Sequence, residues 1–305
     1  MSNIITITGD LGSGKTTIAS RLAEYLHIDF VSTGIIQRDI ASKYGMNTLE
    51  LNKYAENNPK IDDEIDGIIK NLGKANKDIV VDSRLAWFFL GNSLKIYLFA
   101  NIEVAAKRIM SADNRKEEKY DSIEHAIRDI KARRASEDSR FKSYYGADCR
   151  DLNNFDIIID TSFAPISYIF DIILKNIDNW RKNLAMPHCW LSPKNIYPTQ
   201  NIVQIAREDA KEILNSIKEF GYQVTAPVSV AEYKGYLFIV DGHKRVSASI
   251  FQNLTLIPAK LVANDQNPLS WGSSVKQFVQ DHYKPSWIYD WEDAHKFRFY
   301  SYFEQ

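Results

Sequence analysis

Short apolar runs alternate with amphipathic helical stretches through the first 180 residues of the chain. The predicted strands are Ile4–Thr8, Phe30–Ser32, Ile79–Asp82, Lys95–Ala100 and Asp156–Asp160. Between the first two strands, Thr16–Leu26 places apolar side chains on one helical face. Strands that alternate with helices favour a parallel sheet covered by helices on both faces. The pattern therefore predicts a three-layer α/β domain over residues 1–180, built on a five-stranded parallel sheet.

The pattern changes after Trp180. Three prolines punctuate Met186–Thr199, which is typical of a linker that leads into a new domain. The elements predicted beyond it are a helix Ala206–Phe220, a strand Pro227–Glu232, a turn at Lys234-Gly235, a strand Tyr236–Val240, a helix Arg245–Gln252 and a strand Ile257–Val262. We therefore expect a smaller α+β domain over residues 186–305, with an aromatic-rich tail.

Charge and cysteine usage narrow the range of partners. The 305 residues include 38 Lys+Arg and 39 Asp+Glu, so no net field attracts nucleic acid or an anionic membrane. Cys149 and Cys189 form no C-x-x-C pair and lie near no histidine cluster, which indicates reduced cysteines and no zinc. No apolar run suggests a membrane span or a cleavable leader. We expect a cytoplasmic protein without membrane or nucleic-acid partners.

The first motif with candidate chemistry is Gly9–Thr17, which has the spacing G-x-x-x-x-G-K-T of a P-loop. Glycines let the backbone aim its N–H groups at a phosphate chain, while the lysine reaches the β/γ-phosphates and the following hydroxyl reaches Mg²⁺. The predicted nucleotide-binding residues are Gly9, Gly12, Ser13, Gly14, Lys15, Thr16 and Thr17. ATP and Mg²⁺ are the predicted cofactors.

Two more strand ends carry candidate ligands. After the second strand, Thr33 and Gly34 open a helix with Arg38 one turn inside it, which is a suitable cradle for a second phosphate. The third strand ends at Asp82, a candidate Mg²⁺ ligand, and Arg84 follows. Because ligands bind beyond the carboxyl ends of parallel strands, these groups should converge on the P-loop. For the two arginines, surface ion pairs are the alternative.

A mixed-charge stretch follows between residues 107 and 140. Such a stretch is typical of a solvated helix. Phosphoryl transfer, however, requires mobile cations that close over the migrating group and exclude water. A lid that carries Arg133 and Arg140 would supply them.

The order of these motifs resembles that of cytidylate kinases of the archaeal type. The resemblance covers residues 1–180 and is carried by GDLGSGKTT, STGIIQRDIA, MNTLELNKYAE, the pair Ile61-Asp62 and Ile65-Asp66, VDSRLA, RRASE and YGAD. It implies that Lys15 and Thr16 bind ATP, that Arg38 and Arg84 bind the monophosphate acceptor, and that Arg133 and Arg140 close over the transfer site. The chain departs from the family pattern at Ser83 and Trp87, where the acceptor base is expected.

The second domain has its own motif, a strand that ends in Asp-Gly and turns into a basic helix start. Free N–H groups and cationic side chains at such a turn form a phosphate site, although a plain turn with surface charges is the alternative. The residues concerned are Asp241, Gly242, His243, Lys244 and Arg245. The segment order over residues 186–263 resembles the ParB/sulfiredoxin superfamily. That resemblance implies a bound nucleotide or phosphorylated metabolite.

Together these features predict a nucleoside-monophosphate kinase that transfers phosphoryl groups from ATP. The expected catalytic residues are Lys15, Asp82, Arg133 and Arg140, and Thr16 and Asp82 are the expected metal ligands. Two alternatives remain open: a kinase of a non-nucleotide alcohol such as a free amino acid, and a nucleotide-gated regulator associated with DNA. The aromatic tail favours a packed cap or a homodimer surface.

Overall fold

The computed structural model describes residues 3–56, 58–75, 77–112, 120–204, 207–299 and 303 of the chain. Parts of three predicted segments lie outside these ranges: residues 113–119 of the mixed-charge stretch, Ala206 of a predicted helix and residues 300–302 of the tail. The chain forms two compact units. Unit 1 consists of Met1–Asp156 and Pro165–Leu184, and unit 2 consists of Ile157–Ala164 and Ala185–Gln305.

Four of the predicted strands form a parallel sheet in unit 1. They are β1 (Ile4–Gly9), β2 (Asp29–Ser32), β3 (Ile79–Asp82) and β4 (Ser93–Phe99), in the order β2-β3-β1-β4. Every residue of β1 is buried, as expected of a central strand. The fifth predicted strand also forms, as β5 (Ile157–Asp160), but it belongs to unit 2. A five-stranded sheet within the first domain is therefore not confirmed.

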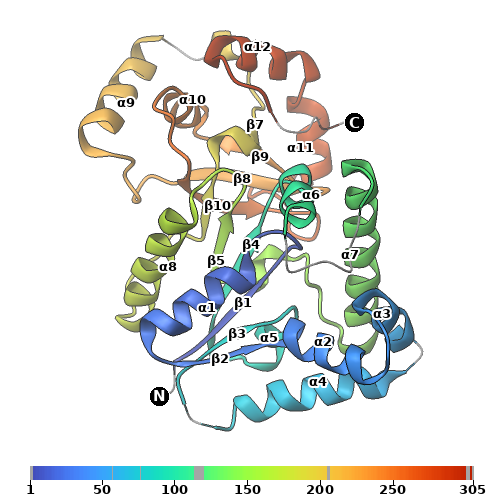
Figure 1. Cartoon of the computed structure of the whole chain (residues 1–305). Coiled ribbons are helices and arrows are strands. Elements are labelled where there is room, and N and C mark those ends of the chain that lie inside the picture. The colour runs from blue at the N-terminus through green and yellow to red at the C-terminus, as the bar shows by residue number, and fades with distance from the viewer. Residues whose placement is uncertain are drawn as a thin grey trace. The chain divides into compact units, whose positions relative to one another are not determined.

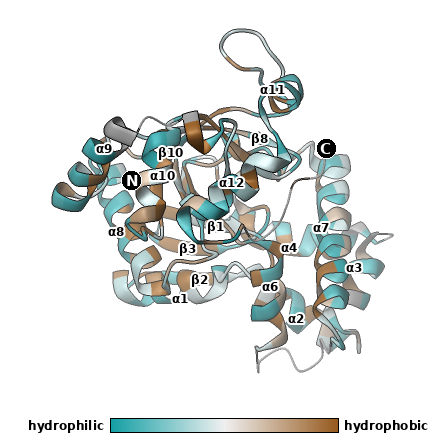
Figure 2. Ribbon diagram, turned by 90° about the horizontal axis from the view of Figure 1, so that it is seen from above, coloured by the Kyte–Doolittle hydropathy of each residue, from teal (hydrophilic) through white to brown (hydrophobic). Residues whose placement is uncertain are grey.

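The helices of unit 1 include the predicted Thr16–Leu26, which forms as α1, and Figure 2 shows hydrophobic colour along β3 but both colours on the helices. They are α1 (Lys15–Leu26), α2 (Thr33–Lys43), α3 (Thr48–Glu56), α4 (Pro59–Leu72), α5 (Ala86–Phe89), α6 (Ile102–Met110), α7 (Ile123–Tyr145) and α8 (Ile166–Arg181), with a 3₁₀ turn at Leu152–Asn154. Helices α1 and α8 lie side by side (Figure 1), and Tyr25 meets Phe170 there. Between β2 and β3, α2, α3 and α4 pack together through one apolar cluster.

Unit 2 is built on a mixed sheet in the order β5-β6-β10-β8-β9-β7. Its further strands are β6 (Cys189–Leu191), β7 (Ile196–Tyr197), β8 (Val228–Tyr233), β9 (Tyr236–Asp241) and β10 (Ile257–Ala263). Its helices are α9 (Arg207–Phe220), α10 (His243–Phe251), α11 (Val275–His282) and α12 (Pro285–His295), with 3₁₀ turns at Pro193–Asn195 and Ile202–Gln204. The predicted hairpin is confirmed, because Lys234 and Gly235 both have positive φ and join β8 to β9.

The aromatic tail contains two helices, α11 and α12, that the sequence pattern did not predict. Its side chains pack inside unit 2: Trp291 is fully buried and donates from Nε1 to the carbonyl of Gln200 at 3.0 Å. The ring of Phe303 meets that of Phe238 edge-on. Trp291 and Phe303 thus pack as part of a cap, whereas Trp271 is 59% exposed. No helix in the described ranges is long and apolar enough to cross a membrane.

Candidate active site

The P-loop geometry depends on glycine at two close approaches. Gly9, at the end of β1, has φ +145°, and a Cβ there would lie 1.8 Å from the carbonyl oxygen of Leu98. Gly12 has φ +76°, and a Cβ there would lie 2.7 Å from the carbonyl oxygen of Ala105. Since no side chain fits these positions, the loop keeps its backbone close to its neighbours and leaves the first N–H groups of α1 free for a ligand.

Lys15 folds back over this loop. Its Nζ donates to the carbonyl oxygen of Asp10 at 3.0 Å, and Ser13 Oγ donates to the same oxygen at 2.8 Å. Burial, reinforced by the nearby Arg84 guanidinium, lowers the pKa of Lys15 to about 8. The ammonium group of Lys15 is therefore held next to another cation. A bound anion would reduce the repulsion between the two.

The carboxylate of Asp82 joins the ends of three elements. Thr16 Oγ1 of α1 donates to Asp82 Oδ2 at 2.6 Å, and Ser32 Oγ of β2 donates to the same oxygen at 3.0 Å. Hydroxyl and carboxylate oxygens are the ligands that Mg²⁺ prefers, usually with water and substrate phosphates completing its shell. Thr16 and Asp82 therefore fit the predicted metal site. Among the described residues no group of three or more His, Cys, Asp or Glu side chains could hold a metal.

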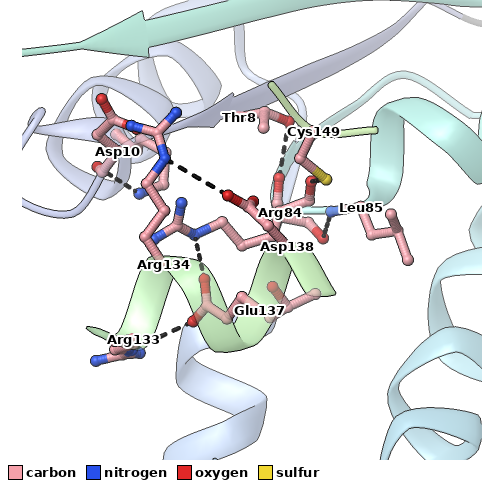
Figure 3. A network of polar contacts seen from close by, with 12 residues as sticks. Thr8, Asp10, Arg84, Leu85, Arg133, Arg134, Glu137, Asp138 and Cys149 are labelled. Atoms are coloured by element: carbon pink, nitrogen blue, oxygen red, sulfur yellow. Dashed lines mark hydrogen bonds and ion pairs between the residues drawn. The ribbon is translucent and has the colours of Figure 1, made fainter. Parts of the chain in front are cut away.

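Arg84 and Arg133 share one buried carboxylate. Arg84 Nε lies 3.2 Å from Glu137 Oε2, and Arg133 Nε donates to Glu137 Oε1 at 3.2 Å, so Glu137 of α7 lies between them in Figure 3. Although burial opposes ionisation, these two guanidinium groups hold the pKa of Glu137 below its ordinary value. Arg84 Nη2 is buried without a hydrogen-bond partner. Part of the Arg84 guanidinium is thus available to a ligand.

A second network ties α7 to the P-loop itself (Figure 3). Arg134 Nη1 lies 2.5 Å from Asp10 Oδ1, and Arg134 Nη2 donates to the hydroxyl of Tyr97 at 3.0 Å. The Tyr97 hydroxyl in turn donates to Asp10 Oδ1 at 3.0 Å. The sequence motifs did not predict that Asp10, Tyr97, Arg134 and Glu137 belong to the site. The acidic residue inside the P-loop and the Arg-x-x-x-Glu spacing on one helical face were the signals that could have found them.

The remaining predicted residues of unit 1 do not all lie next to the P-loop. Thr33 is buried and donates from Oγ1 to the carbonyl of Asp82 at 3.4 Å, whereas Arg38 is exposed and pairs with no described residue. Arg140 is buried, with Nε 3.0 Å from Asp62 Oδ2 and Nη1 donating to the carbonyl of Asn52 at 3.3 Å. Arg133 and Arg140, expected to act together, thus face different partners.

In unit 2, the five residues of the Asp-Gly turn do come together. Gly242 has φ +104° and caps α10. His243 is buried, its Nε2 accepts from the N–H of Thr199 at 3.1 Å, and burial lowers the pKa of His243 to about 4. Arg245 donates to the carbonyls of Ala226 and Pro227, and its Nη2 lies 2.6 Å from Asp241 Oδ2. His243 and Arg245 thus already stabilise the turn.

Comparison with known proteins decides the family. Residues 4–163 match the sequence model of the cytidylate kinase-like family. This chain belongs to that family. The cytidylate kinase of Pyrobaculum neutrophilum is 39% identical over 166 residues, which are 54% of this chain and 86% of that protein. The cytidylate kinase of Sulfolobus acidocaldarius is 40% identical over 188 residues, or 60% of this chain and 99% of that protein.

Membership in the cytidylate kinase-like family confirms the predicted enzyme class, a nucleotide kinase, and the P-loop α/β fold of unit 1. A solved shikimate kinase from Acinetobacter baumannii aligns over 59% of this chain and 96% of its own, with 18% identity and a TM-score of 0.40. Residues 164–305 lie outside the family match. The resemblance of residues 186–263 to the ParB/sulfiredoxin superfamily stays a prediction.

Proposed function

We propose that this protein transfers the γ-phosphoryl group of ATP to a pyrimidine nucleoside monophosphate, CMP or dCMP. One observation carries the proposal: the Lys15 ammonium and the Arg84 guanidinium are held close enough for one to lower the pKa of the other, and Arg84 Nη2 lacks a hydrogen-bond partner. Like charges held together in this way favour a shared polyanion. The names of the relatives, cytidylate kinases at 39% and 40% identity, support the choice of acceptor.

Each half of the proposed site has its own residues. The N–H groups of the P-loop and Lys15 bind the donor phosphates, and Thr16 and Asp82 would hold Mg²⁺, which when bound neutralises charge on those phosphates. Thr33, Gly34, Arg38 and Arg84 bind the acceptor phosphate. An acceptor oxygen then attacks the γ-phosphorus in line, the bond to the β-γ bridging oxygen breaks, and ADP leaves. Arg133 closes over the migrating group and excludes water. Arg140, which was expected to act with it, is instead buried against Asp62 and the carbonyl of Asn52.

The test is a panel of acceptors offered to the purified full chain with Mg·ATP. CMP, dCMP, UMP, AMP and GMP are compared with free serine and glycerol, and ADP and phosphorylated product are separated by chromatography. We expect turnover with CMP or dCMP that Lys15→Ala abolishes, whereas Lys131→Ala, at an exposed position on α7, keeps it. Turnover of serine or glycerol alone, or full activity of Lys15→Ala, would refute the proposal.

We also propose that unit 2 binds a phosphorylated ligand at the turn formed by residues 241–245. The start of α10 supports this, since it is capped by Gly242 without a side-chain hydrogen bond and the first N–H groups of a helix lack intrahelical acceptors. Because Arg245 also holds the carbonyls of Ala226 and Pro227, its removal would disturb the turn itself, and the variant tested is therefore Lys244→Ala. Calorimetry with CTP on full-length Lys15→Ala should show binding that the added Lys244→Ala weakens. Unchanged binding would mean that the turn has only a structural role.

We further propose that the enzyme is located in the cytoplasm.

A further inference from the structure

A group of buried polar side chains lies where α3, α4 and α7 meet in unit 1. Asn52 of α3 is 6% exposed, Asp62 and Asp66 of α4 are 7% and 5% exposed, and Arg140 of α7 is 5% exposed. Helices α2 to α4 otherwise meet through an apolar cluster. Buried polar groups cost free energy unless they are satisfied, so this group needs an explanation.

The group is only partly satisfied by its own contacts. Arg140 Nε lies 3.0 Å from Asp62 Oδ2, yet neither atom makes a hydrogen bond. The side chain of Asp66 bonds to the Tyr145 hydroxyl, but its Oδ2 has no partner. Asn52 accepts from Arg140 at its backbone carbonyl, while its side-chain Nδ2 is buried and unpartnered. Apart from the Arg140–Asp62 ion pair, one donor, Asn52 Nδ2, and one acceptor, Asp66 Oδ2, therefore remain without a partner.

This group adjoins the expected acceptor phosphate site along two paths. On α7, Arg140 follows Glu137, the partner of Arg84, by three residues, which is about 4.5 Å along the helix axis. On α5, which follows Arg84 closely, Phe88 and Phe89 have ring centroids 6.5 and 5.5 Å from that of Tyr145, the residue bonded to Asp66. A nucleotide whose phosphate lies at Arg84 would extend its base toward this group.

We propose that Asn52 and Asp66 select the base of the acceptor nucleotide, with the Asp66 carboxylate accepting from an exocyclic amino group and the Asn52 amide donating to the ring. This inference rests on the proposed function, and the two residues would make that kinase activity specific for cytosine. The unpartnered atoms match the amino-bearing edge of cytosine, which offers an N–H₂ donor beside acceptors. Uracil presents a carbonyl there and would leave the carboxylate unpaired.

Burial of these side chains increases the expected preference for cytosine over uracil. The unpartnered atoms are covered in the present structure, so the base reaches them only when α3 and α4 separate from the last turns of α7. Water is then excluded, and a mismatched base leaves a buried acceptor without a donor. Burial also raises the pKa of Asp66, which an amino group donating to the carboxylate would offset.

The experiment compares kcat/KM for CMP and UMP in the full chain and in Asp66→Asn. The amide is almost the same size as the carboxylate but can donate to the uracil carbonyl, so the CMP-to-UMP ratio should fall about 10- to 100-fold. Asp63→Asn, one position from Asp62 but exposed on α4, is the matched control and should keep the ratio. An equal loss with both acceptors would mean a purely structural role and would overturn the inference.

Two more measurements keep the outcome decisive. If Asp66→Asn does not fold, Asn52→Ala is tested for the same ratio, and the wild-type chain is tested with the 2-pyrimidinone nucleotide, which lacks the amino group. The inference requires at least a tenfold loss with that analogue relative to CMP. A wild-type chain that phosphorylates CMP and UMP equally well overturns only this inference. One that phosphorylates no nucleoside monophosphate overturns the proposed function as well.

Discussion

The titration of Lys15 makes ATP binding depend on pH. Burial and the nearby Arg84 lower the pKa of Lys15 to about 8, so in the free enzyme Lys15 loses its positive charge as the pH rises through 8. Bound phosphates favour the ammonium form and raise its pKa, so binding takes up protons. We expect an uptake of about half a proton per ATP at pH 8, measured by calorimetry in buffers of different ionisation enthalpy. ATP affinity should fall by up to about tenfold per pH unit above that.

Lys15→Met gives the control for this prediction. It removes the titrating group without adding a charge, so the proton uptake near pH 8 should disappear. Uptake that persists in Lys15→Met would assign the proton to another group.

Two glycines of unit 1 should respond in opposite ways to the same substitution. Gly9→Ala places a Cβ 1.8 Å from a backbone oxygen, so either β1 or β4 must shift and ATP binding should be lost. At Gly67, within α4, no atom lies within 4 Å of the position that a Cβ would take, so Gly67→Ala should stabilise the protein by about 0.5–1 kcal/mol. Thermal unfolding and ATP titration of both variants provide the measurement. Retained ATP affinity in Gly9→Ala would contradict the close approach.

At the scale of elements, α7 connects the two halves of the site. Arg84→Met should raise the acceptor KM or lower kcat, while ATP affinity stays within a few fold, because only the acceptor side loses a charge-assisted pair. It also leaves buried Glu137 with Arg133 alone, so it should lower the free energy of unfolding by about 1–3 kcal/mol. Adding Glu137→Gln removes the poorly paired buried charge, so it should restore part of the lost stability. The acceptor KM should stay raised.

Calorimetry and urea unfolding separate the two effects of Arg84→Met. Equal weakening of ATP binding would remove Arg84 from the acceptor side. A double variant no more stable than Arg84→Met alone would show that Glu137 carries no buried charge to compensate.

Local sequence patterns predicted the strands of unit 1 and several residues of the candidate site. The strands of unit 1, the P-loop and Asp82 follow from apolar runs and motif spacing within short segments, and the structure bears out those strands. The contacts of Glu137, and of Asp10 with Tyr97 and Arg134, join segments far apart in the chain. Periodicity cannot predict such pairs. The assignment of β5 to unit 2 was missed for the same reason, because strand partners are set by tertiary packing.

At the scale of the whole molecule, unit 2 depends on a strand from the middle of the chain. Ile158 and Ile159 of β5 pair with Cys189 and Trp190 of β6. Asp160, fully buried, accepts from the N–H of Ser192 at 3.3 Å. A fragment 186–305 lacks these contacts and exposes the edge of β6, so we expect it to melt without a cooperative transition.

Fragment 154–305, which restores β5, is the comparison. It should show a sigmoidal thermal transition by circular dichroism. Equal cooperativity in the two fragments would mean that β5 contributes nothing to the stability of unit 2.

The separation of β5 from β6 along the chain also has a consequence during synthesis. Ile157, Ile158 and Ile159 emerge from the ribosome about 30 residues ahead of Cys189, and at about 5–20 residues per second the delay is on the order of seconds. During that time a run of isoleucines lacks its β6 partner, and such edges attract other chains and chaperones. The test uses ribosome-bound chains stalled at a length where β5 has emerged from the exit tunnel and β6 is still inside it. A protease should cleave these chains near β5 but spare chains stalled after the C-terminus has emerged.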